Sequence, residues 1–197
     1  MTMADHSELF VRPLGPGDVD AYIAHVLLVD AESGIDGAPH SHPYLRSELE
    51  EDEGAREREL DRWAAPLDEP GWRRGWGLLD ADRIVGHLYL AGGDLRSEMH
   101  RISMGMGIVS THHRRGGGSM LLASAIEWAR DQPDVAWLDR GVFGDNAAAR
   151  ALYERHGLAE IGTIPERFRV DGVSLDDVMM TLDVATAASH RFAPNAE

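Results

Sequence analysis

The feature that most constrains the fold lies in the middle of the chain, where a strand, a glycine-rich loop and a helix follow one another. A strand is expected at about residues 99–109, and the loop after it reads Arg114-Arg115-Gly116-Gly117-Gly118-Ser119. Over residues 117–130 apolar side chains recur at helical spacing, which predicts an amphipathic helix. Its buried face is expected to consist of Leu121, Leu122, Ala125, Ile126 and Ala129.

This loop has the properties of an anion site. Consecutive glycines permit positive φ angles and a close approach of the backbone to a ligand. The free N–H groups at the helix start point at one spot, where the helix dipole also favours negative charge. Arg114 and Arg115 add cationic side chains there. A pyrophosphate fits these properties; the structural alternative is an exposed glycine turn with two arginines. The Gly-Lys-Ser/Thr ending of a P-loop is missing, as is the acidic residue that a dinucleotide-binding fold requires.

The other elements complete a β-α-α-β-β-β-α-β-α-β-β order, which predicts a mixed α/β sheet with helices on both faces. Asp18 is expected to be the N-cap of the first helix. Loops are expected at residues 34–43 and, with many charges, at 165–177. The remaining strands are expected at 9–14, 72–80, 83–91, 135–143, 158–164 and 178–182, and the remaining helices at 18–27, 44–65 and 147–156.

Length and apolar content indicate one folded domain. The 197 residues, 43% of them apolar, suffice for a buried core without disulfides. We expect a single domain over residues 1–197, with its core at about 9–183 and a mobile tail at 185–197. The sequence has neither an apolar run that could span a bilayer nor the pattern of a signal peptide, which predicts a cytoplasmic protein without membrane contact.

Composition excludes several classes of function. The chain has no cysteine, which excludes disulfides, thiolate metal sites and a cysteine acyl-enzyme. The formal charge of −15 opposes binding to nucleic acids. It favours cationic partners such as amines or basic peptides, and it also serves solubility. His40, His42, His112 and His113 lack further ligands at a diagnostic spacing, so no metal is expected and these loop histidines should be exposed to solvent.

Two blocks resemble the GNAT N-acetyltransferase superfamily. Its signature Q/R-x-x-G-x-G/A, between a strand and a helix, matches His113-Arg114-Arg115-Gly116-Gly117-Gly118, with His113 in place of Gln or Arg. A second register begins at Arg114 and uses Gly117 and Ser119. The family also shows N-x-x-A-x-x-L-Y-x-x-x-G-F. At that spacing this chain has Asn146, Ala149, Leu152, Tyr153, Gly157 and Leu158.

The resemblance implies a mostly antiparallel sheet with one splayed strand pair, and an enzyme that uses acetyl-CoA. The acetyl group would pass by direct attack, within a ternary complex, to an amine of a small molecule or peptide. The backbone of Met106, Gly107 and Ile108 would bind the pantetheine arm and polarise the thioester, and Asn146 would contact the arm from the other side. Tyr153 would protonate the departing thiolate; alternatively it packs helix against sheet. The implied cofactor contacts in the loop are His113, Arg114, Arg115, Gly116, Gly117, Gly118 and Ser119.

The general base stays open at this stage. Some relatives carry a glutamate five positions before the asparagine, where this chain has Gly141. Asp139, Glu98 and His100 are candidates, but an ordinary surface or structural polar role is favoured for each, so none is assigned.

The resemblance places the acceptor pocket between residues 34–76, the strand beginning near Met99 and the 165–177 loop. Trp63, Trp72 and Trp76 belong either to the core or to this pocket. Two further hypotheses remain: a non-catalytic acyl-CoA-binding module, and an acyltransferase that uses a longer acyl chain. A monomer or a homodimer is expected.

Overall fold

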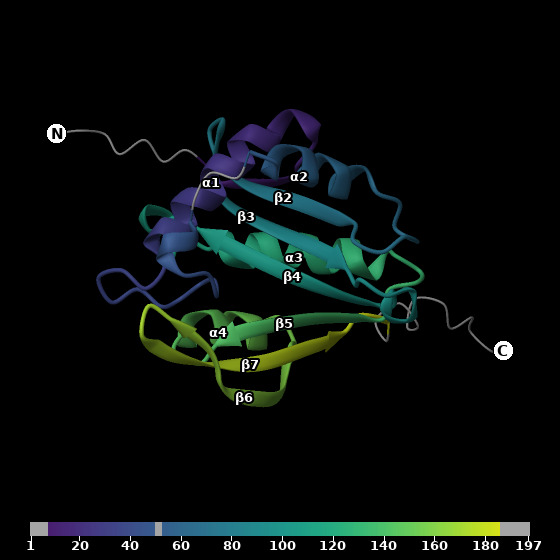
Figure 1. Ribbon diagram of the computed structural model, residues 1–197. Helices are drawn as coiled ribbons and strands as arrows, with labels where there is room; N and C mark the ends of the chain where they lie inside the picture. Colours follow the sequence, from purple (N-terminus) through teal and green to yellow (C-terminus); the bar gives the residue numbers. More distant parts are fainter. Residues whose placement is uncertain (1–7, 50–52, 186–197) are drawn as a thin grey trace.

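A computed structural model describes residues 8–49 and 53–185 and shows a seven-stranded sheet with helices on both faces (Figure 1). The strands lie in the order β1-β2-β3-β4-β5-β7-β6. Among the described residues the elements are β1 (Phe10–Pro13), α1 (Val19–Glu32), α2 (Ala55–Ala64), β2 (Arg73–Asp80), β3 (Arg83–Gly92), β4 (Arg101–Ile108), α3 (Gly117–Arg130), β5 (Trp137–Phe143), α4 (Ala147–Arg155), β6 (Ala159–Val170) and β7 (Val173–Asp183).

One strand pair in the sheet is parallel. All other neighbours pair antiparallel, whereas β4 and β5, joined through α3, run in the same direction. Their pairing covers only Arg101–Ser103 against Trp137–Asp139. β4 stays paired with β3 as far as Ile108, and β5 stays paired with β7 as far as Phe143. The two strands therefore separate beyond Ser103, and the predicted mixed, mostly antiparallel sheet with a splayed pair is confirmed.

The main core lies between α3 and the sheet. The five residues predicted for the buried face of α3 are at most 4% exposed. Burying a leucine side chain contributes about 2 kcal/mol, so this face supplies much of the stability. Trp72 and Trp76 are also buried here, with ring centroids 5.8 and 5.7 Å from that of Trp128. Both tryptophans thus belong to the core. Trp63 lies elsewhere, 5.5 Å from the ring of Tyr22 on α1.

The predicted helix at 44–65 is wrong in its first half. Arg46–Glu48 forms one 3₁₀ turn, and α2 begins only at Ala55. Residues 50–52 lie outside the described residues. The run from 48 to 53 holds five acidic residues, whose mutual repulsion at helical spacing opposes a helix. Gly54 then occupies the N-cap position of the shorter helix.

The charged loop predicted at 165–177 is also wrong, because β6 and β7 continue through it as a long hairpin. Asp171 and Gly172 form its turn with φ angles of 48° and 88°. Asp-Gly is a preferred pair for a two-residue hairpin turn. A bulge between Ile164 and Phe168 accommodates Glu166, whose φ is 46°. Charged side chains therefore mark an exposed edge strand here.

Two further predictions concern Asp18 and the C-terminal tail. Asp18 occupies the N-cap position of α1 as predicted, although its carboxylate accepts hydrogen bonds from Arg12 and the Gly15 N–H. The predicted mobile tail lies, apart from Ala185, outside the described residues. None of the helices in the described ranges combines the length and apolarity that crossing a membrane requires.

Candidate active site

The start of α3 presents free backbone donors. Gly116 is its N-cap with φ of 85°, in the left-handed region that glycine tolerates, and Arg114 also has a positive φ of 59°. In the described structure no side chain caps the helix. The N–H groups of Gly117, Gly118 and Ser119 therefore lack acceptors within the helix. With the helix dipole, this arrangement suits an anion that has several acceptor oxygens.

The glycines of the loop serve different purposes. A Cβ on Gly116 would meet nothing within 4 Å, so this position is glycine because of its φ angle. A Cβ on Gly117 would lie 2.2 Å from Cδ2 of Leu78, because the helix start rests directly on β2. A Cβ on Gly118 would lie 3.0 Å from Cδ2 of Leu152 on α4. The run thus shapes the loop and brings α3 close to both β2 and α4.

The cationic side chains of the loop differ in their surroundings. Arg114 and Arg115 are exposed, and Nη1 of Arg115 lies 3.7 Å from Oδ2 of Asp80. Nε2 of His113 lies 2.7 Å from the Ile108 carbonyl oxygen, and since a carbonyl only accepts, this nitrogen carries the hydrogen. His113 therefore ties the loop to the end of β4.

The edge of β4 that faces β5 is free of strand pairing beyond Ser103. Met106 and Gly107 lie on this stretch. At one end of it the Met104 carbonyl oxygen accepts a hydrogen bond from Arg140 Nη1 at 3.0 Å, and at the other end the Ile108 carbonyl oxygen accepts one from His113. A Cβ on Gly107 would lie 2.6 Å from Val29 of α1, so glycine lets that helix approach the strand. Backbone groups here are available to an extended ligand.

Tyr153 and Asn146 flank this region from α4. Tyr153 is 1% exposed and interacts electrostatically with Arg140. Asn146 is the N-cap of α4, where its Oδ1 accepts from the Ala149 N–H at 3.1 Å. Ser119, in the first turn of α3, lies 3.2 Å from Nε2 of His156. The loop, the β4 edge and α4 thus bring the predicted site residues into one region.

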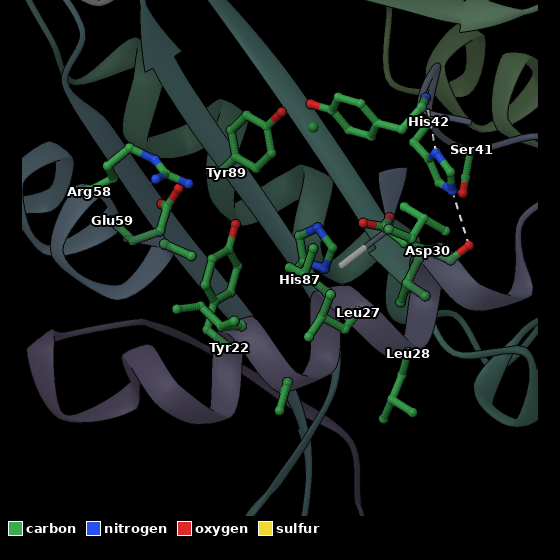
Figure 2. A pocket seen from close by; sticks show the side chains of 18 of the residues that line it. Tyr22, Leu27, Leu28, Asp30, Ser41, His42, Arg58, Glu59, His87 and Tyr89 are labelled. Atoms are coloured by element: carbon green, nitrogen blue, oxygen red, sulfur yellow. Dashed lines mark hydrogen bonds between the residues drawn. The ribbon is translucent and has the colours of Figure 1, made fainter. Parts of the chain in front are cut away.

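A cavity of about 1150 Å³ opens on the opposite face of the sheet (Figure 2). Its walls come from α1, the 41–49 segment, α2 and the strands β2, β3, β4 and β5. Residues from the 34–76 range line this cavity, whereas no described residue of the 165–177 segment does. Met106 lines it and also lies on the free edge of β4. The cavity and the unpaired edge therefore meet at this residue.

The profile of the acetyltransferase (GNAT) family matches residues 39–158. The chain belongs to this family. It is therefore an acyltransferase, and the resemblance of the two sequence blocks is confirmed. A search of curated proteins finds no match.

Solved structures agree with this assignment. A GNAT-family acetyltransferase from Streptococcus pneumoniae shares 23% identity at a TM-score of 0.73, over 89% of this chain and 99% of that one. A Salmonella typhimurium structure described with acetyl-CoA as its cofactor has 16% identity and a TM-score of 0.73, over 96% and 99% of the chains. The spermidine/spermine N-acetyltransferase of Vibrio cholerae has 20% identity and a TM-score of 0.67, over 94% and 99%. These neighbours share the GNAT fold.

The three base candidates of this acetyltransferase are engaged elsewhere or peripheral. Asp139 accepts from Arg101 at 2.7 and 2.6 Å and from Thr181 at 2.6 Å. Oε1 of Glu98 accepts the N–H groups of two preceding residues. His100 is exposed. None of them lines the cavity.

Two loop histidines of the acetyltransferase are buried, against the prediction of solvent exposure. His112 is 5% exposed, with Nε2 2.8 Å from Oδ2 of Asp80. His42 is 8% exposed, and its ring packs on Tyr44. His113 is exposed as predicted and His40 is partly so, with Nδ1 3.0 Å from Oδ2 of Asp145. His112 and His42 each stabilise the loop in which they lie through contacts with other segments, and the local sequence does not reveal such contacts.

The inner wall of the cavity carries polar residues that sequence reasoning missed. Glu59 is 8% exposed and pairs with Arg73 at 2.5 Å and Arg62 at 2.9 Å. Burial lowers the pKa of His87 to about 3, assisted by nearby positive groups, so this imidazole is neutral. Burial also raises the pKa of Tyr22. The alternation on β3 puts His87 and Tyr89 on one face, which is the signal that would have found them.

Proposed function

We propose that this acyltransferase passes the acetyl group of acetyl-CoA to an amine by direct attack in a ternary complex. The observation that carries the proposal is the free edge of β4, which runs from the uncapped start of α3 to the cavity. A ligand with a diphosphate at one end and an extended amide arm fits such a path. The acetyl-CoA described for the Salmonella neighbour and the amine substrates named for the Vibrio enzyme are consistent with it.

The geometry of the loop supports the proposed cofactor contacts. The diphosphate would accept hydrogen bonds from the first-turn N–H groups of Gly117, Gly118 and Ser119, with Arg114 and Arg115 close by. The amides of the arm would pair with the backbone over Met106–Ile108. His113 would hold the end of β4 in position, and Asn146 would face the arm from α4. Acetyl-CoA supplies the acyl group in activated form, as a thioester.

The residues of the chain then promote transfer. A backbone N–H of β4 donates to the thioester oxygen and stabilises the negative charge that develops during attack, which is worth about 3 kcal/mol. The amine nitrogen bonds to the carbonyl carbon as the carbon–sulfur bond breaks. Tyr153 gives its phenolic proton to the leaving sulfur, and the proton that the amine nitrogen loses on becoming an amide restores the phenol. The chain has no cysteine, so an acyl-cysteine enzyme is excluded.

An acetyl-CoA thiol-release assay against a panel of amines tests this function. We expect turnover with at least one acceptor. Tyr153→Phe should lower kcat by about 100-fold, while the affinity for CoA, measured by calorimetry, stays unchanged. Tight CoA binding without turnover of any acceptor would instead favour the non-catalytic acyl-CoA-binding module.

A further inference from the structure

Half of the charged side chains that line the cavity form ion pairs with one another. Glu59 pairs with two arginines on the inner wall, and Asp20 pairs with Arg56 at 3.0 Å. Glu48, Glu53 and Arg58 are exposed. Asp30 and Arg140 are different, because both are partly buried and neither forms an ion pair with any described residue. The full set of charged lining residues is Asp20, Asp30, Glu48, Glu53, Glu59, Arg56, Arg58, Arg62, Arg73 and Arg140.

The Arg140 guanidinium contacts Tyr153 and the backbone of β4, but one of its nitrogens is buried without a partner. Nη1 donates to the Met104 carbonyl oxygen at 3.0 Å, and the buried Nε has no partner among the described residues. Burial lowers the pKa of Arg140, but Tyr153, Tyr89 and Asp177 raise it by more, so the group stays charged. A buried cation without an anionic partner is unfavourable. The planar guanidinium suits a carboxylate, which it binds with two parallel hydrogen bonds.

Asp30 presents the opposite charge at the end of α1. Its backbone carbonyl oxygen lies 3.0 Å from Nε2 of His42, whose Nδ1 accepts from the Tyr44 N–H at 3.2 Å. The two residues lie together at one end of the cavity (Figure 2). Burial raises the pKa of the Asp30 carboxyl by more than His42 lowers it, so this group accepts a proton more readily than an ordinary aspartate.

Asp30 and Arg140 line the cavity together with Met106. Arg140 donates to the Met104 carbonyl oxygen, and Val29, the neighbour of Asp30, lies against Gly107, so both groups belong to the part of the cavity next to the free edge of β4. An α-amino acid carries a carboxylate and an ammonium group, and it can therefore form one charge-assisted hydrogen bond with each of these two opposite charges.

We propose that the acceptor is a free α-amino acid with an apolar side chain, whose carboxylate is bound by Arg140 and whose ammonium proton is taken by Asp30. This rests on the proposed acetyl transfer. Ile23, Val26 and Leu27 of α1 form an apolar wall for the side chain. Once Asp30 holds the first proton, the neutral nitrogen bonds to the acetyl carbon, the carbon–sulfur bond breaks, and the sulfur takes the Tyr153 proton. The nitrogen then gives its second proton to the Tyr153 phenolate, and Asp30 releases its proton to solvent. The products are an N-acetylamino acid and CoA.

The test compares leucine with 3-methylbutylamine, which is leucine without its carboxylate. In the thiol-release assay we expect kcat/KM to be at least 100-fold higher for leucine. Arg140→Met should abolish this preference, and the matched control Arg83→Met, at the exposed β2–β3 turn, should keep it. Asp30→Asn should lower kcat and remove the acidic limb of its pH profile, with Arg140-dependent leucine binding retained.

The outcomes separate this proposal from the one on which it rests. Equal turnover of both acceptors by the wild-type protein overturns the amino-acid proposal and leaves acetyl transfer intact. An equal loss for both acceptors in Arg140→Met also overturns it, because Arg140 would then act on the leaving thiolate. Should no amine be turned over, or should the Arg140 variant not fold, calorimetry of the CoA-saturated wild-type protein decides. Leucine must bind at least tenfold more tightly than 3-methylbutylamine, and equal or absent binding contradicts the proposal.

Discussion

Replacing Gly117 with alanine tests whether the start of α3 can lie against β2 only because residue 117 has no side chain. The added methyl would lie 2.2 Å from Cδ2 of Leu78, a residue with no solvent exposure. Leu78 cannot move outward, so the helix start or the core must shift. Overpacking of this kind destabilises a folded protein by about 1–3 kcal/mol. The higher helix propensity of alanine offsets at most about 1 kcal/mol of this loss.

We expect Gly117→Ala to lower the free energy of unfolding by about 1–2 kcal/mol in urea denaturation. Leu78→Ala alone should cost about 2–5 kcal/mol, because it leaves a cavity in the core. In the double variant the new methyl occupies part of that cavity. The double variant should therefore be more stable than the sum of the single effects predicts, by about 1–2 kcal/mol.

Gly116→Ala is the matched control for this cycle. Its methyl has open space but must adopt φ of 85°, so it should cost about 1 kcal/mol and add independently to Leu78→Ala. Strictly additive effects of the Gly117 and Leu78 changes, or a Gly117→Ala protein as stable as the wild type, would refute the packing argument.

Three further predictions concern polar groups. At pH 7, Asp18→Asn should lower the free energy of unfolding by about 1 kcal/mol. The hydrogen bond from Arg12 lowers the pKa of Asp18 to about 2, so this difference between the two proteins should fade as the pH falls from 5 to 2. Urea titrations at several pH values should show it. The pKa of His87 is about 3 in the folded protein and 6.5 ordinarily. As the pH falls, this histidine is therefore protonated in the unfolded chain before it is protonated in the folded protein. The free energy of unfolding should fall by about 2 kcal/mol between pH 6.5 and 5. His87→Gln should lack this loss in the same titration. Asn146→Ala removes the cap of α4 and should lower the melting temperature by about 2–4 °C. Asn146→Asp keeps an acceptor oxygen and should not lower it. Equal melting temperatures for the two variants would contradict the capping role.

The helix after the glycine loop could be predicted from sequence to the residue. Its start is marked by Gly116, its end by Arg130, and its buried face by a regular apolar spacing, and all three signals are local. The helix predicted at 44–65 was too long, because α2 begins only after Gly54, which occupies its N-cap position. The β6–β7 hairpin was missed although Asp171-Gly172 is a local turn signal.

The cavity depended on contacts that sequence does not show. His87 and Tyr89 face it because β3 pairs with β4 in a register that sets them opposite Gly107 and Gly105. Asp30 gains its position only when α1 packs on β4. These relations join distant segments, whereas the glycine loop and its helix are contiguous.

Calorimetric titration of the wild-type protein with CoA, beside pantetheine, which lacks the diphosphate and the 3′-phosphoadenosine, tests the central claim most directly. The free N–H groups of Gly117, Gly118 and Ser119 predict that CoA binds and that pantetheine binds at least 100-fold more weakly. Folded protein that takes up no CoA at millimolar ligand, or that binds both equally, would contradict the account.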